Sequence, residues 1–122
     1  MDDFLDDSYG GLGYYQQLNN LYEEVEQEID NLREYEYQAA DSEGTYRMLV
    51  TEKTAAERMR GTPVTIIGHL VKGDSEVVQA FLEMEKAKAN AKACSHLIFL
   101  KKGKMEMLTE VIKHEWYRPS NG

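Results

Sequence analysis

Two long segments of the chain repeat apolar residues with the period of an α-helix. Within residues 14–60 and again within residues 75–117, apolar side chains alternate at spacings of four and three, the seam pattern of a coiled coil. The first stripe consists of Leu18, Tyr22, Val25, Ile29, Leu32, Ala39, Tyr46 and Val50, interrupted by Glu36, Glu43 and Lys53. The second stripe consists of Met84, Ala87, Ala91, Cys94, Ile98, Met105, Leu108 and Ile112, with Lys101 on it.

Residues 61–74 separate the two helical segments and are expected to reverse the chain. Gly61 follows the last periodic residue of the first segment, as a glycine just past a helix end does, and Pro63 cannot continue a helix. Because the segments on the two sides have similar lengths, the pattern predicts an all-α fold. This fold is a long, coiled-coil-like antiparallel helical hairpin with a structured apolar turn.

A short helix is expected inside this turn. Thr65 would cap it, and Gly73 would end it with a left-handed backbone, after which Asp74 or Ser75 would cap the next helix. The apolar side chains of the turn either fold onto the end of the helical core or form a tip that binds a partner, because exposed apolar clusters often mark interfaces. The candidate tip residues are Ile66, Ile67, Leu70 and Val71.

The tetrapeptide Asp41–Gly44 is the weak point of the first segment. Glycine costs about 1 kcal/mol relative to alanine inside a helix, and Asp and Ser prefer helix caps. We favour one long helix with a soft spot here. The alternative is a break, with Asp41 or Ser42 capping a second helix. If the helices pair outward from the turn, Lys101 lies within one turn of Glu36, and an ion pair between them would set the register.

A two-helix hairpin leaves apolar surface uncovered. Residues 97–100 are apolar at four consecutive positions, so their side chains point to several sides of the helix and several sides should be buried. Homo-oligomerisation, most simply a two-fold dimer that forms a four-helix bundle, would cover them. The expected interface residues are Leu97, Phe99, Leu100 and Trp116.

The hairpin domain is expected to cover residues 14–117, with a mobile acidic tail at 1–13 and a disordered C-terminus at 118–122. The acidic start is the opposite of the basic beginning of a signal peptide, and no apolar run approaches the roughly 18 residues of a membrane span. Cys94 is the only cysteine, so an internal disulfide is excluded. These features predict a cytoplasmic protein that does not bind membranes.

The net charge of −8 is unevenly distributed along the chain. Residues 1–70 hold 15 acidic residues against 5 Lys and Arg, whereas residues 71–122 hold 7 against 9. The first half would repel free nucleic acid, so a basic protein is the expected partner. The candidate binding face on the first helix consists of Glu23, Glu24, Glu26, Glu28 and Asp30. The alternative interpretation of these acids is a solvated helix face.

The sequence lacks the motifs of common catalytic and metal sites. It contains no nucleotide-binding glycine loop, paired-cysteine motif, His-Glu-x-x-His or Gly-x-Ser-x-Gly. His114 and Glu115 beside Glu110 have no evident third metal ligand. A lysine patch can contact phosphates, but few aromatic residues flank it. This possible nucleic-acid contact consists of Lys101, Lys102 and Lys104. We expect no enzymatic activity, no metal and no cofactor.

The turn and the second segment carry a resemblance to a protein family. Gly61-Thr62-Pro63-Val64-Thr65 is followed by Leu70-x-Lys72-Gly73-Asp74-x-Glu76-Val77, and Glu115-Trp116 closes a helix rich in lysine and alanine. Over about residues 45–117, these features resemble a family of small, uncharacterised helical-hairpin proteins encoded by phages and prophages of low-GC Gram-positive bacteria. The resemblance implies a phage-encoded, non-enzymatic protein of the host cell cytoplasm, and it carries no functional residues over.

Two classes of function follow from these features. In the first, the protein is an inhibitor or adaptor that binds a host or phage protein. A defence nuclease is a natural target, since an acidic helix can compete with nucleic acid for a basic groove, as anti-CRISPR proteins can. In the second, it is an accessory protein of phage DNA replication or recombination that contacts DNA through the lysine patch. A virion or assembly protein is a third possibility, and the charge of −8 favours the first class.

Overall fold

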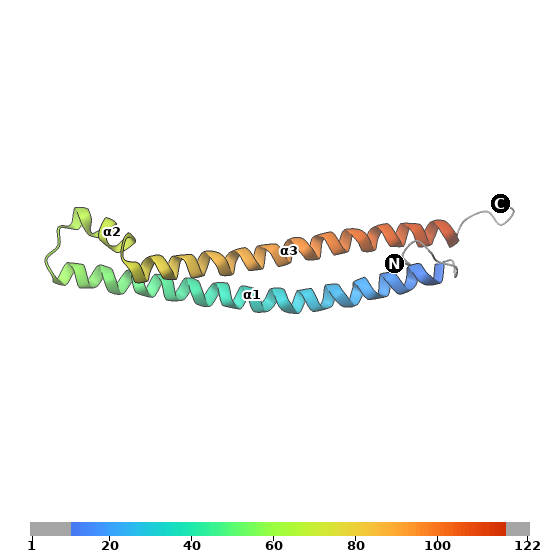
Figure 1. Ribbon diagram of the computed structural model, residues 1–122, viewed down its shortest axis with the longest axis horizontal. Coiled ribbons are helices and arrows are strands. Elements are labelled where there is room, and N and C mark those ends of the chain that lie inside the picture. The colour runs from blue at the N-terminus through green and yellow to red at the C-terminus, as the bar shows by residue number, and fades with distance from the viewer. Residues whose placement is uncertain (1–10, 117–122) are drawn as a thin grey trace. The chain divides into compact units, whose positions relative to one another are not determined.

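The computed structural model describes the backbone of residues 11–116 and the side chains of residues 13–115. It is all-helical in this range, as predicted. Helix α1 spans Gly11–Met59, α2 spans Val64–Lys72 and α3 spans Ser75–Trp116 (Figure 1). Helix α1 thus begins within the segment expected to be an acidic tail. The rest of that tail, residues 1–10, and the expected disordered C-terminus, residues 118–122, lie outside the described residues.

Helix α1 is continuous through the predicted soft spot at Asp41–Gly44. A Cβ atom added at Gly44 would meet no neighbouring atom within 4 Å, so no close contact requires a glycine at this position. The single long helix that we favoured is therefore confirmed, and the alternative break is wrong.

Contacts divide the chain into two compact units. Unit 1 contains the described parts of Met1–Asn31 and Cys94–Gly122, and unit 2 contains Leu32–Ala93. Within each unit, residues that come later in α1 contact residues that come earlier in α3. Lys101 of α3 meets Glu24 of α1 in unit 1, and Cys94 meets Glu28. This packing is consistent with the predicted helical hairpin.

The inward face of α3 follows the predicted stripe. The buried members are Met84, Ala87, Cys94, Ile98, Leu108 and Ile112. The half-buried members are Ala91, Lys101 and Met105. Two further turns toward the N-terminus, Val77 and Ala80 continue the same spacing and are also buried. The apolar pattern of the second segment therefore identified the packing face of α3.

The inward face of α1 departs from the predicted stripe at alternate positions. Tyr22 and Ile29, both assigned to the stripe, are 57% and 41% exposed. Leu21 and Glu28, one position earlier in each case, are turned inward instead. The buried or half-buried positions in this part of α1 include Leu21, Val25, Glu28, Leu32, Tyr35 and Ala39. Near Lys101 the prediction failed because Glu28, which contacts this lysine of α3, turns inward in place of the adjacent Ile29.

Helix α1 ends in a Schellman motif, in which two hydrogen bonds close the last turn around a left-handed residue. Gly61 has a φ of +81°. Its N–H donates to the Arg58 carbonyl at 3.0 Å, and the Thr62 N–H donates to the Glu57 carbonyl at 3.1 Å. The predicted role of Gly61 is confirmed.

Helix α2 ends at Lys72, directly before Gly73, as predicted, but its start and the conformation of Gly73 differ from the prediction. The helix begins at Val64 with Pro63 at its N-cap and no side-chain cap, so Thr65 lies inside the first turn and does not cap it. Gly73 has a φ of −90°, in the right-handed region, and its N–H donates to the His69 carbonyl at 3.1 Å. The predicted left-handed conformation of Gly73 is therefore wrong, because helical hydrogen bonding continues through it.

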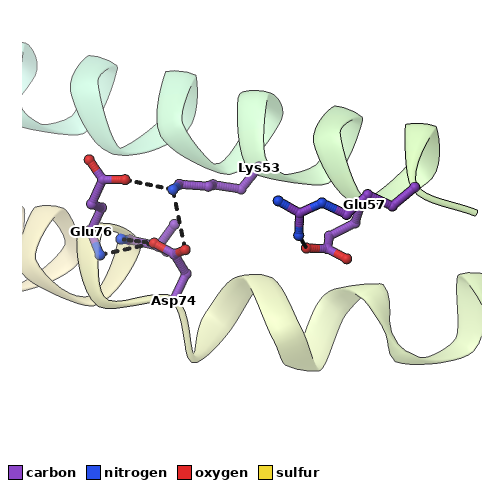
Figure 2. Close-up of polar contacts among 6 residues, drawn as sticks. Lys53, Glu57, Asp74 and Glu76 are labelled. Carbon is purple, nitrogen blue, oxygen red and sulfur yellow. Dashed lines mark hydrogen bonds and ion pairs between the residues drawn. The ribbon is translucent and has the colours of Figure 1, made fainter. Parts of the chain in front are cut away.

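Asp74 caps α3, one of the two predicted possibilities. Its Oδ1 accepts hydrogen bonds from the N–H groups of Glu76 and Val77 at 2.9 and 3.2 Å. Lys53 of α1 reaches the same corner, with Nζ 3.3 Å from Asp74 Oδ2 and 2.5 Å from Glu76 Oε1 (Figure 2). Burial alone would raise the pKa of Asp74, but the Val77 N–H, the Lys53 ammonium and the Glu76 N–H lower it below its usual range. The start of α3 is thereby tied to α1.

Helix α2 folds back along the last turns of α1 (Figure 1). Ile67 and Val71 form a buried cluster with Val77 of α3. The half-buried α1 residues packed against this cluster are Tyr46, Leu49 and Val50. Because α2 occupies the surface beside the end of α1, α3 begins opposite Lys53 rather than opposite the end of that helix.

Candidate interaction surfaces

Lys101 is held on the inward face of α3 by two carboxylates of α1. Its Nζ lies 3.2 Å from Glu24 Oε1 and 3.3 Å from Glu28 Oε2. The predicted ion pair of Lys101 with Glu36 is wrong, because the packing within unit 1 places Glu24 and Glu28 opposite Lys101 instead. The interaction of Lys101 with a glutamate at the helix interface was foreseen, but its partner was not.

Glu28 gathers the remaining polar groups of this interface. Its Oε1 accepts a hydrogen bond from Asn31 Nδ2 at 3.2 Å, and Cys94 Sγ lies 3.3 Å from its carbonyl oxygen. The hydrogen bond from Asn31 and the contact with Lys101 lower the pKa of Glu28. Burial and the neighbouring Glu28 raise the pKa of the Cys94 thiol, which favours its protonated form. The arrangement connects α1 and α3 within unit 1 through polar contacts.

The predicted acidic face is divided by this interface. Glu24 and Glu28 turn toward Lys101. Glu23, Glu26 and Asp30 are exposed and succeed one another at spacings of three and four along α1. Side chains at such spacings share one side of a helix, so these three residues are the part of the face that a partner can reach.

The predicted oligomer interface is exposed in the single chain. Leu97, Phe99 and Leu100 are solvent-accessible, whereas Ile98 between them is buried. The side chain of Trp116, the fourth predicted residue, lies outside the described side chains. Two to three turns after Leu97, Met107 is also exposed, although the sequence analysis did not assign it to this surface.

Two shallow depressions adjoin these residues in unit 1. One, of about 570 Å³, lies between the helices and is lined by residues that include Leu21 of α1 and Met107 of α3. The other, of about 490 Å³, is lined by Phe99, Leu100 and Gly103 among others, and also by Met107. Both are mainly apolar, and they can receive side chains of a partner helix.

The turn divides its apolar residues between the interior and the surface. Ile67 and Val71 are buried in unit 2, as expected if the turn folds onto the helical core. Ile66, Leu70 and Val64 are exposed, as expected of a tip that binds a partner. One side of α2 therefore packs onto the helical core, and binding of a partner to the other side stays a prediction.

The lysine patch is also divided. Lys101 is 19% exposed and engaged by α1, whereas Lys102 and Lys104 are exposed. Near the end of α3, Glu110 contacts Lys113 at 3.6 Å. Within residues 11–116, no group of three His, Cys, Asp or Glu residues is placed to hold a metal ion. No helix of this range has the length and apolar character to cross a membrane.

Sequence and structure comparisons identify no relative of this chain. Protein-family models, curated proteins and solved structures were compared, and none matches. The surfaces that remain for function are the exposed acids of α1, the apolar groups beside the depressions of unit 1 and the outer side of α2.

Proposed function

We propose that the chain is a non-enzymatic protein-binding module that works as a helical-bundle homo-oligomer and recognises a basic protein through the exposed acids of α1. The observation that supports this proposal is a negative charge that folding does not neutralise. Lysines of α3 pair with Glu24, Glu28 and Glu43 of α1. Glu23 and Glu26 stay exposed.

The origin and the target belong to the same proposal. The resemblance of the turn and of α3 to phage and prophage proteins favours a phage-encoded protein that acts in the cytoplasm of the host. A host defence nuclease is a suitable target, because its nucleic-acid groove is basic and attracts an acidic helix. Complementary charge chiefly accelerates association and selects partners.

The rival proposal, an accessory protein of DNA replication or recombination, draws less support from the described surfaces. Lys101 is occupied by Glu24 and Glu28, so only Lys102 and Lys104 of the patch are exposed. Two lysines release few counterions from DNA, and the binding they provide is weak at physiological salt. Tight binding of free DNA by the unmodified protein at about 150 mM salt would favour this rival.

Charge reversal on α1 tests the proposal. Capture from host extract with mass spectrometry supplies the partner, and surface plasmon resonance then measures binding. We expect Glu23→Lys with Glu26→Lys to slow association about tenfold at low salt, and less at high salt, because screening weakens long-range attraction. Glu24 and Glu28 are unsuitable for this test, because reversing them also breaks the contact with Lys101.

The matched control changes the net charge equally on the other long helix. Glu85→Lys with Glu106→Lys alters two exposed acids of α3. If recognition depends on the α1 face, this control associates nearly as fast as the unmodified protein. Equal slowing by both pairs would show that only total charge matters, and unchanged rates for both would refute the acidic face as the binding surface.

A further inference from the structure

Helix α3 carries a second stripe of side chains in unit 1, beside its buried stripe. Its members recur at spacings of three and four, and they are Leu97, Leu100, Lys104, Met107 and Val111. Leu100 and Met107 are 63% and 70% exposed although both are apolar. A helix that packs against one neighbour needs one such stripe, and a second stripe on another side is typical of a helix with a second neighbour.

The surface around the second stripe has a projecting side chain and two depressions. Met107 borders both depressions of unit 1, the larger between the helices and the smaller beside Gly103. A Cβ atom added at Gly103 would meet nothing within 4 Å, so the floor of the smaller depression is open. The face therefore offers a projecting side chain with a hollow on each side, which is the relief that knobs-into-holes packing requires.

We propose that the occupant of this face is the same face of a second copy of the chain, in a two-fold symmetric dimer. In a two-fold interface one patch meets itself, so it must contain both the projection and the hollow that receives it. Met107 and the larger depression of about 570 Å³ supply the two parts. The inference rests on the proposed homo-oligomer and names the surface through which it forms.

Charge complementarity supports the same occupant. Glu24 of α1 and Lys104 of α3 both line the larger depression, from opposite helices. Glu24 contacts Lys101 through Oε1, and its second oxygen can accept a further hydrogen bond. In a dimer whose two-fold axis runs along the helices, α3 of each copy packs on α1 of the other. Lys104 of one copy then faces Glu24 of the other, and the contact occurs twice.

The first test compares two methionines of similar exposure. Met107 lines both depressions, whereas Met48 of α1, which is 64% exposed, lines neither. We expect sedimentation equilibrium to give a dimer of the 14.0 kDa chain. Met107→Glu should weaken this dimer on the order of a hundredfold, because it places a carboxylate in an apolar interface, and Met48→Glu should leave it unchanged. Circular dichroism verifies that both variants stay helical.

The outcomes separate this inference from the proposed function. A monomeric unmodified protein would overturn both the homo-oligomer and the interface. A dimer that tolerates Met107→Glu, or that is weakened equally by Met48→Glu, would overturn the interface alone. Loss of partner binding in the acidic-face variants with an intact dimer would leave the inference untouched, because Glu23 and Glu26 line neither depression.

Mixing two charge-reversed variants tests the pairing of copies directly. Lys104→Glu alone and Glu24→Lys alone each place like charges together twice, and each dimer should weaken about tenfold. In an equimolar mixture, both contacts regain opposite charges, so the heterodimer should recover the original affinity. Mixing cannot repair the Glu24–Lys101 contact within a chain, so recovery reports a contact between copies. Absence of recovery would refute the proposed pairing of Lys104 with Glu24.

Discussion

At the scale of single residues, two glycines at the ends of α1 and α2 have different physical roles. Gly61 has a φ of +81°, which costs other residues roughly 1 kcal/mol or more, whereas Gly73 has a φ of −90°. We expect Gly61→Ala to lower the free energy of unfolding by about 1 kcal/mol in urea titrations. Gly73→Ala should leave it unchanged or raise it by a few tenths, because its Cβ would make an ordinary contact 3.5 Å from the His69 carbonyl oxygen. Equal losses would show that both positions need glycine.

At the scale of elements, one side of α2 packs against α1 and the start of α3. Ile67 is 5% exposed and packs with Val71 and Val77, whereas the adjacent Ile66 is 44% exposed. We expect Ile67→Ala to cost roughly 2–4 kcal/mol of unfolding free energy, because it leaves a cavity in this cluster. Ile66→Ala is the matched control, and its cost should stay below about 1 kcal/mol. A larger loss for Ile66 would mean that the opposite side of α2 faces the core.

The same elements show how far the sequence determines the fold. The stripe of α3 was predictable because its apolar residues keep a regular spacing of four and three, and each of them is buried or half-buried. In α1, Ile29 fits the apolar pattern and the adjacent Glu28 does not. The carboxylate of Glu28 nevertheless turns inward, because it contacts Lys101 of α3, and the pattern along α1 does not reveal this contact. The register depended on how α2 folds back, which spacing along the chain does not reveal.

The candidate surfaces were predictable to a similar extent. The apolar run at residues 97–100 was visible in the sequence, but the exposure of Met107 beside both depressions was not. Assigning Met107 to a second stripe requires knowing which side of α3 already packs against α1. The acidic residues were visible as well, whereas the sequence does not reveal which of them meet lysines of α3.

At the scale of the whole molecule, carboxylates that tie α1 to α3 occur in both units. Hydrogen bonds from Asn31 and Lys101 lower the pKa of Glu28, and the hydrogen bond and charge of Lys88 lower the pKa of Glu43. A carboxyl group with a pKa lower in the folded than in the unfolded chain stabilises the fold above its unfolded pKa, near 4.5 for glutamate. This contribution is lost as the pH falls through the lower folded pKa.

Acid titration of the stability therefore distinguishes paired from exposed carboxylates. We expect the urea midpoint of Glu28→Gln with Glu43→Gln to lie below that of the unmodified protein at pH 7. The difference should vanish as the pH falls through the lowered pKa values of the two glutamates in the folded chain, because protonation then makes them resemble glutamine. Glu23→Gln with Glu26→Gln removes the same charge from exposed positions and should show no such converging difference. If both pairs converge alike, the acid sensitivity comes from total charge and not from the contacts between α1 and α3.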